Sequence, residues 1–236
     1  MLESLLNSMF EYKSREMYTA LPAVVVSVHN NLSTLTIDAQ PAVNVREPDS
    51  ENVIPRPVIQ NIPVQMPSSS TSAFTYPVNV GDSVLLVFCM DGIDSWKRGD
   101  GRSSTPSDYR HHSIRDCFAI TGIHTMSGSV NNPSKRVWAH NTKDAVITHN
   151  IGSGNETEVR LLASGGVVIN TNQSATINCK EANINSTTMN VNVPNTNWNG
   201  DIKHTGVIDN SGTIKSNDVT VTNHTHNCGV PPDKGT

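Results

Sequence analysis

One stretch of the chain decides the fold: residues 175–193 read ATINCKEANINSTTMNVNV. Near its end, Met189, Val191 and Val193 alternate with asparagine, and its earlier part alternates in the same way. Side chains at i and i+2 share one face of a β-strand, so the pattern predicts short strands with one apolar face. Each face offers only two or three side chains of modest size. That is too little to offset an ordering entropy of about 1–2 kcal/mol per residue.

The same texture extends over residues 142–222, where Asn, Thr, Ser, Val and Gly dominate. Its strands lack the regular coils of about 20 residues or more that a single-chain solenoid needs. Three identical chains wound around a common axis would pool their thin apolar faces into one core. A narrow axis would also explain why the inward residues are small. The sequence therefore predicts an all-β homotrimer in which residues 142–222 form the shaft of an intertwined trimeric β-helix.

Residues 20–125 predict a separate small domain that precedes this shaft. Short runs rich in Val and Ile are separated by turns such as Gly81-Asp82, which is the pattern of β-strands. Five strands in a segment of about a hundred residues suit a small closed barrel, and the OB-fold is the natural candidate. The expected strands lie at 22–28, 32–39, 58–66, 83–90 and 117–123.

Residues 1–19 predict a helical docking segment. Its apolar residues recur at helical spacing and form one stripe; they are Leu2, Leu5, Leu6, Met9 and Phe10. Two interpretations stay open, because the stripe could pack on its own domain or on a partner or neighbouring subunit.

Residues 126–141 predict a connector between barrel and shaft. Inside the barrel, residues 91–116 concentrate charge in a weakly charged protein. That charge fits either a solvated surface or a contact with a partner or another subunit.

Composition narrows the class of protein. The 236 residues carry a formal net charge of −4 and are only 36% hydrophobic and 16% charged. The mild acidity argues against a nucleic-acid partner, which would need a basic stripe for phosphates. The sequence shows neither a signal-peptide pattern nor a run of about 20 apolar residues, so we expect a protein made in the cytoplasm. Four scattered cysteines without a C-x-x-C pair predict free thiols.

The sharpest local motif is His224-Thr-His226, which follows the last predicted strands within residues 223–236. Histidines at i and i+2 of an extended segment point to the same side, and imidazole is the commonest neutral metal ligand. A three-fold axis would turn two imidazoles per chain into six around one ion. Zinc prefers four ligands, so an octahedral set of six favours iron(II), with nickel or cobalt as alternatives. We predict a metal-binding apex at residues 223–236, with His224 and His226 as ligands.

These features together resemble the central membrane-piercing spikes of contractile-tailed bacteriophages, a group that includes those of phages phi92, Mu and P2. The resemblance rests on the domain order and on the closing segment from His224 to the Gly-Val-Pro-Pro-Asp-Lys-Gly-Thr end. It rests also on Asp94-Ser-Trp96 and on residues 109–122, which look like the end of that family's OB-fold domain.

The resemblance implies a specific role. The spike would belong to the tail baseplate of the virion and pierce the host outer membrane with its apex when the sheath contracts. It implies one iron ion per trimer, held by His224 and His226 of three chains. It also implies attachment to the tail hub or tube proteins through the N-terminal domain. No enzymatic activity is expected.

Three rivals remain open. One is a spike of a type VI secretion system or another contractile injection machine. Another is a receptor-binding fibre. The third is a polysaccharide-degrading tailspike, for which Glu156 and Glu158 on one face of a strand would be the candidate carboxylates. Neighbouring basic residues instead favour an ordinary surface pair, and no catalytic motif accompanies it.

Overall fold

The computed structural model describes residues 2–31, 34–46, 51–216 and 219–220. By its internal contacts the chain divides into two units, Met1–Thr176 and Ile177–Thr236. Within the described residues, no helix has both the length and the apolar character needed to cross a bilayer. The domain boundaries expected at residues 126 and 142 stay predictions, because the division into two units does not test them.

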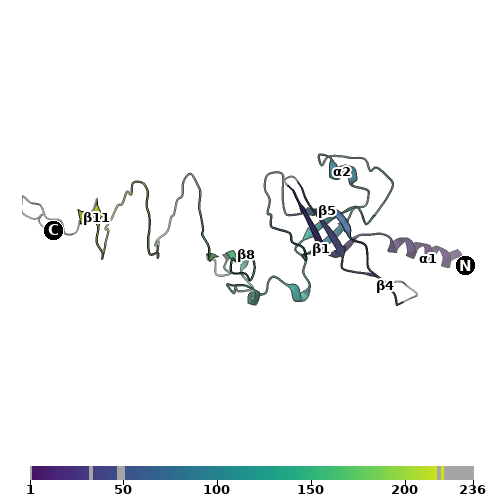
Figure 1. Ribbon diagram of the computed structural model, residues 1–236, viewed down its shortest axis with the longest axis horizontal. Helices are drawn as coiled ribbons and strands as arrows, with labels where there is room; N and C mark the ends of the chain where they lie inside the picture. The colour runs from purple at the N-terminus through teal and green to yellow at the C-terminus, as the bar shows by residue number, and fades with distance from the viewer. Residues whose placement is uncertain (1, 32–33, 47–50, 217–218, 221–236) are drawn as a thin grey trace, which may run out of the picture. The chain divides into compact units, whose positions relative to one another are not determined.

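The first unit contains a closed five-stranded barrel (Figure 1). Its strand order is β1-β2-β5-β7-β6, and β5 and β7 are the only parallel neighbours in it. This arrangement confirms the prediction of an OB-like barrel. The strands are β1 (Ala20–Asn30), β2 (Leu35–Pro41), β5 (Ile59–Gln65), β6 (Ser83–Phe88) and β7 (Cys117–Thr121).

Alternation along the strands builds the barrel core. In β6, every second residue is buried, from Val84 through Leu86 to Phe88. A turn ahead of β6 depends on Gly81, whose φ of 96° suits glycine and whose N–H donates to the Val25 carbonyl oxygen (2.9 Å). The core consists of Ala23, Val25, Ile37, Ala39, Ile59, Ile62, Val78, Val84, Leu86, Phe88, Cys117 and Ala119.

Several elements lie outside the five strands of the barrel. Helix α1 (Leu2–Arg15) confirms the predicted N-terminal helix. Two elements were not predicted: the hairpin of β3 (Val45–Arg46) with β4 (Val53–Ile54), and the short helix α2 (Asp94–Arg98) inside the charged loop. The connector holds two single 3-10 turns, Met126–Gly128 and Pro133–Lys135.

A separate three-stranded antiparallel sheet follows the connector. It is formed by β8 (Ala145–His149), β9 (Thr157–Leu161) and β10 (Val167–Thr171), in the order β10-β9-β8. These three strands lie within residues 142–222, where the sequence predicts short strands. Both outer strands of this sheet leave one edge without a hydrogen-bonded neighbour among the described residues.

The second unit contains little regular structure in the described part. It holds one short hairpin, β11 (Lys215–Ser216) with β12 (Val219–Thr220). Residues 177–214 contain neither a strand nor a helix, although the sequence predicts strands there. The β-helix expected over residues 142–222 is therefore absent from the single chain and stays a proposal.

Candidate assembly interface

The predicted metal ligands His224 and His226 lie outside the described residues. Among the residues that the structure describes, no cluster of three or more His, Cys, Asp or Glu side chains is placed to hold an ion. The metal site therefore stays a prediction. The features that the structure does place are exposed apolar surfaces and two internal polar networks.

One face of the β8–β10 sheet is apolar and exposed. Val159 of β9 pairs with Ile147 of β8 on one side and with Ile169 of β10 on the other. The next row on the same face is Ala145, Leu161 and Val167. Ile147 is 59% exposed and Ile169 65%, although both are strand residues of a kind that is usually buried. A sheet face of this composition needs a cover.

The opposite face is polar and closed. Glu156, just ahead of β9, is fully buried, and Glu158 within β9 is 1% exposed. The N–H of Val137 donates to both carboxylate oxygens of Glu156 (3.2 Å each), and the N–H of Gly152 donates to one of them (2.5 Å). The expectation of an ordinary surface pair is therefore wrong, because both carboxylates are buried.

Arg160 ties the connector to this polar face. Its guanidinium forms an ion pair with Glu158, whose Oε1 also accepts from Nδ2 of Asn170 (2.8 Å). The same guanidinium donates to the carbonyl oxygens of Trp138 (3.0 Å) and Ala139 (3.3 Å). The connector is thus fixed to the β8–β10 sheet by charge-assisted hydrogen bonds, which are stronger than neutral ones.

Residues 177–214 present many exposed apolar side chains on backbone without regular secondary structure. Ile177 is 85% exposed and Val207 89%. No backbone–backbone hydrogen bond joins this segment to another described residue. The remaining exposed apolar side chains of the segment include Ile184, Met189, Val191, Val193, Trp198, Ile202 and Ile208.

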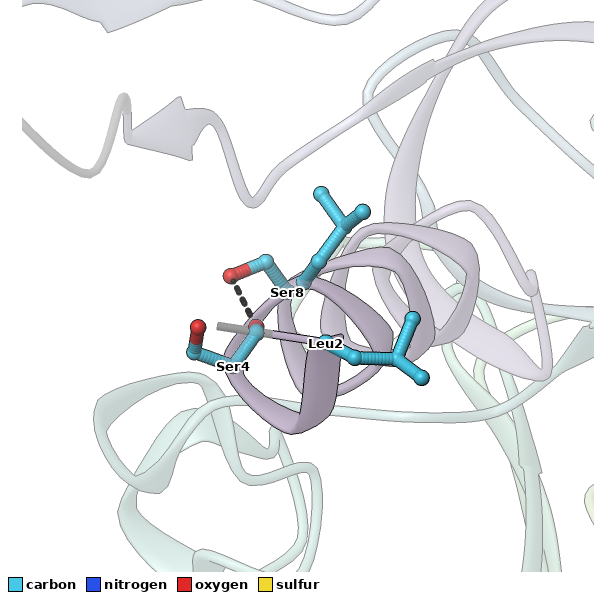
Figure 2. A pocket seen from close by; sticks show the side chains of 4 residues that line it. Leu2, Ser4 and Ser8 are labelled. Carbon is cyan, nitrogen blue, oxygen red and sulfur yellow. Dashed lines mark hydrogen bonds between the residues drawn. The ribbon is translucent and has the colours of Figure 1, made fainter.

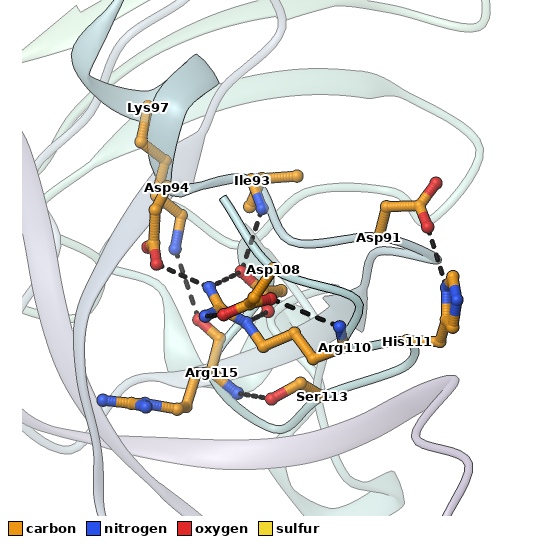
Figure 3. Close-up of polar contacts among 10 residues, drawn as sticks. Asp91, Ile93, Asp94, Lys97, Asp108, Arg110, His111, Ser113 and Arg115 are labelled. Atoms are coloured by element: carbon orange, nitrogen blue, oxygen red, sulfur yellow. Dashed lines mark hydrogen bonds and ion pairs between the residues drawn. The ribbon is translucent and has the colours of Figure 1, made fainter. Parts of the chain in front are cut away.

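Arg110 organises the charged loop of the barrel (Figure 3). Its Nε and Nη2 donate to the buried carboxylate of Asp116 (2.6 and 3.1 Å), and it also pairs with Asp94 (2.5 Å) and Asp108 (2.6 Å). Asp116 receives a further bond from the N–H of Ile93 (3.0 Å). The core of the loop is therefore an internal network. This corrects the interpretation of the whole run as a solvated surface.

The electrostatics of the network follow from burial and pairing. Burial alone would raise the pKa of Asp116, but bonds from Arg110 and from the N–H of Ile93 outweigh it and lower that pKa. Hydrogen bonds to Asp116 and Asp94 raise the pKa of Arg110. Nearby, burial raises the pKa of the Cys117 thiol to about 12, which makes it unreactive. Cys89, Cys117 and Cys179 are free thiols.

The barrel matches a known protein family. Residues 21–122 match the family described as the phage protein Gp138 N-terminal domain. The match begins one residue into β1 and ends one residue after β7, so it covers the barrel and leaves α1, the connector and everything beyond them outside. No protein with curated annotation matches the chain. The barrel is similar to a domain of phage proteins, which supports a virion-associated, baseplate- or spike-like phage protein.

Proposed function

We propose that this chain is the central spike of a contractile phage tail baseplate, and that it pierces the host outer membrane mechanically when the sheath contracts. Two findings support the proposal. The barrel matches a phage protein domain, and the chain beyond the barrel exposes many apolar side chains among its described residues.

The observation that carries the proposal is the extended segment 177–214. Backbone N–H and C=O groups almost always find partners in a folded protein, and large apolar side chains are seldom left exposed in such numbers. In this segment the described residues supply neither a backbone partner nor a cover. Neighbouring strands from two further copies would supply both. The apolar face of the β8–β10 sheet would pack into the same three-fold core.

An intertwined trimer suits a mechanical role. Withdrawing one chain would break its pairing with both neighbours along the whole shaft, so local fraying does not release it. In this proposal the barrel binds the tail hub or tube proteins, and the far end meets the host envelope. Sheath contraction supplies the force, and the shaft concentrates that force on a small area.

The apex would hold one iron ion per trimer. His224 and His226 of three chains provide six neutral nitrogen donors, a set suited to an octahedral first-row metal. The bound ion would cross-link three chains at the end where strands fray most easily. Because ligands from three chains meet only in the folded trimer, metal-binding energy there is also folding energy.

The proposal excludes catalysis as the main role. The candidate glycosidase carboxylates Glu156 and Glu158 are buried beneath the connector and bound to backbone N–H groups, Asn170 and Arg160. A turnover assay on host envelope polysaccharide tests this point, and release of sugar fragments by the purified chain would contradict it.

Native mass and elemental analysis of one purified sample test the proposal directly. We expect a mass of three chains with about one iron per three chains, which is the stoichiometry of one six-histidine site. A metal-free trimer would remove the apex from the proposal and keep the shaft. A monomer would overturn the proposal, because a single chain leaves residues 177–214 without partners.

The phage spike has one close competitor, a spike of a type VI secretion system or another contractile injection machine. The physical argument is the same for both. The match to a phage protein domain favours the phage tail, and purification of virions followed by immunodetection of the chain in the baseplate tests the choice.

A further inference from the structure

Helix α1 presents a broad apolar face that no described residue of its own chain buries. All its side chains are exposed, and the apolar ones gather on one side. At 3.6 residues per turn these side chains span an arc of about 160°. They are Leu2, Leu5, Leu6, Met9, Phe10 and Tyr12, each more than half exposed.

The surface beside this face is open, and the described residues that border it all belong to α1: Leu2, Ser4, Leu5 and Ser8. Figure 2 shows that Ser8 turns back onto its own helix, where its Oγ donates to the Ser4 carbonyl oxygen (3.0 Å). The helix has 14 residues, and isolated helices shorter than about 12–15 residues are marginal in water. The stability of the helix therefore depends on packing against another protein surface.

The charges of α1 narrow the choice of partner. Glu3 and Glu11 balance Lys13 and Arg15, so the helix carries no net charge. A helix that lies on a membrane surface is typically rich in Lys and Arg on its polar face, which does not fit here. Because the helix is neutral, charge attraction would do little to guide it to a charged partner. A second copy of the helix is also neutral, so the two would associate through apolar contact without such guidance.

In a trimer, the short link between α1 and the barrel would bring the three copies of the helix together. Only Glu16 and Met17 separate the helix from Tyr18, which is fixed to the barrel. The Tyr18 N–H donates to the His112 carbonyl oxygen (3.3 Å), and its ring lies 5.2 Å from that of Phe88. In a trimer, three such anchors hold three helix ends within a few residues of their barrels. The short tether gives the helices a high effective concentration for one another.

We propose that the three α1 helices of the trimer pack as a parallel bundle through this apolar face. Leu2, Leu6 and Met9 would lie at the centre, with Leu5 and Phe10 on the flanks. In a parallel bundle each of these residues meets its own copies at the same height, so the face is complementary to itself. The width of the arc suits contact with two neighbours. The proposal rests on the trimer argued above.

Site-specific photocrosslinking tests the bundle on the purified full chain. A photoreactive amino acid in place of Met9 lies at the centre of the apolar face, and one in place of Asn7 lies on the polar side as the matched control. We expect products of two and three chains from position 9 and neither from position 7. Equal yields at both positions, or none at position 9, would overturn the bundle.

Hydrogen exchange on the same full chain provides a second measure. Amides of residues 6–15 should be protected in the trimer, and Leu6→Asp with Met9→Asp should abolish that protection while Asn7→Asp leaves it intact. Native mass of each sample separates the two proposals. A trimer without α1 protection or crosslinks overturns the bundle alone, whereas a monomer overturns the trimer as well.

Discussion

Replacement of Arg110 by methionine should destabilise the barrel strongly. Arg110 is 22% exposed and Asp116, its main partner, only 1%. Arg110→Met leaves the Asp116 carboxylate buried with only the Ile93 N–H as a partner. Removing one partner of a buried ion pair costs about 3–5 kcal/mol. The remaining bond places this case at the lower end, near 3 kcal/mol, which is roughly a 100-fold change in an opening equilibrium.

Amide hydrogen exchange of β6 and β7 measures this loss within the intact assembly, because the two strands border the loop that Arg110 holds. The matched control is Arg102→Met in the same loop. Arg102 pairs with Asp100 at 3.4 Å, but their side chains are 87% and 71% exposed, so the pair contributes little. We expect exchange about 100 times faster for Arg110→Met and almost unchanged for Arg102→Met.

A double variant tests the cause. Arg110→Met combined with Asp116→Asn removes both charges, so it should restore part of the lost protection, since the buried charge is what makes the single variant costly. The reasoning is refuted if Arg110→Met exchanges no faster than Arg102→Met. It is also refuted if the double variant is less protected than Arg110→Met alone.

Three further predictions concern acid, the apex and the sheet. The lowered pKa of Asp116 means that its stabilisation is complete above its unfolded value of about 3.9 and is lost as pH falls through the folded value. On acid titration the barrel amides should therefore stay protected at about pH 5, where metal bound by imidazoles is already leaving as these protonate. Elemental analysis after dialysis measures the second event, and metal retained well below pH 5 would argue against histidine ligation. His224→Ala with His226→Ala should give a metal-free trimer, and an unchanged iron content would contradict the assignment. Ile169→Asp should weaken the trimer in native mass measurements over a dilution series, while Asn172→Asp nearby should not; equal behaviour would remove the β8–β10 face from the interface.

The barrel could be predicted from the sequence because its strands carry their own signals. Alternation in β6 and the turn at Gly81 are local features, and local features are visible in one sequence. Helix α2 was missed because its five residues are too few for a helical period. Its position depends on Arg110, which pairs with Asp94 from 16 residues away, and such a contact leaves no local pattern.

The buried carboxylates show a signal that could have been used. Glu156, Glu158 and Arg160 recur at every second residue, so Glu158 and Arg160 share one face of β9 and Glu156, just ahead of the strand, continues the same alternation. Two acidic residues and one basic residue in such a row, next to a polar connector, fit a closed ion-pair network as well as they fit a solvated surface. In the segment 177–214 the alternation is equally clear, but the strands of the proposed trimer would pair with a second chain, which one folded copy does not contain.

The bonds from Arg160 and Glu156 to the connector have a consequence for how such proteins can be recombined. Residues 130–139 belong structurally with the β8–β10 sheet, although they precede it in the chain. A chimera joined at residue 142 would remove the Val137 N–H that binds the buried Glu156 and the two carbonyl oxygens of Trp138 and Ala139 that accept from Arg160. A joint between Thr121 and Thr125 keeps that module whole. The natural unit of exchange is thus the barrel alone, which is also the extent of the family match.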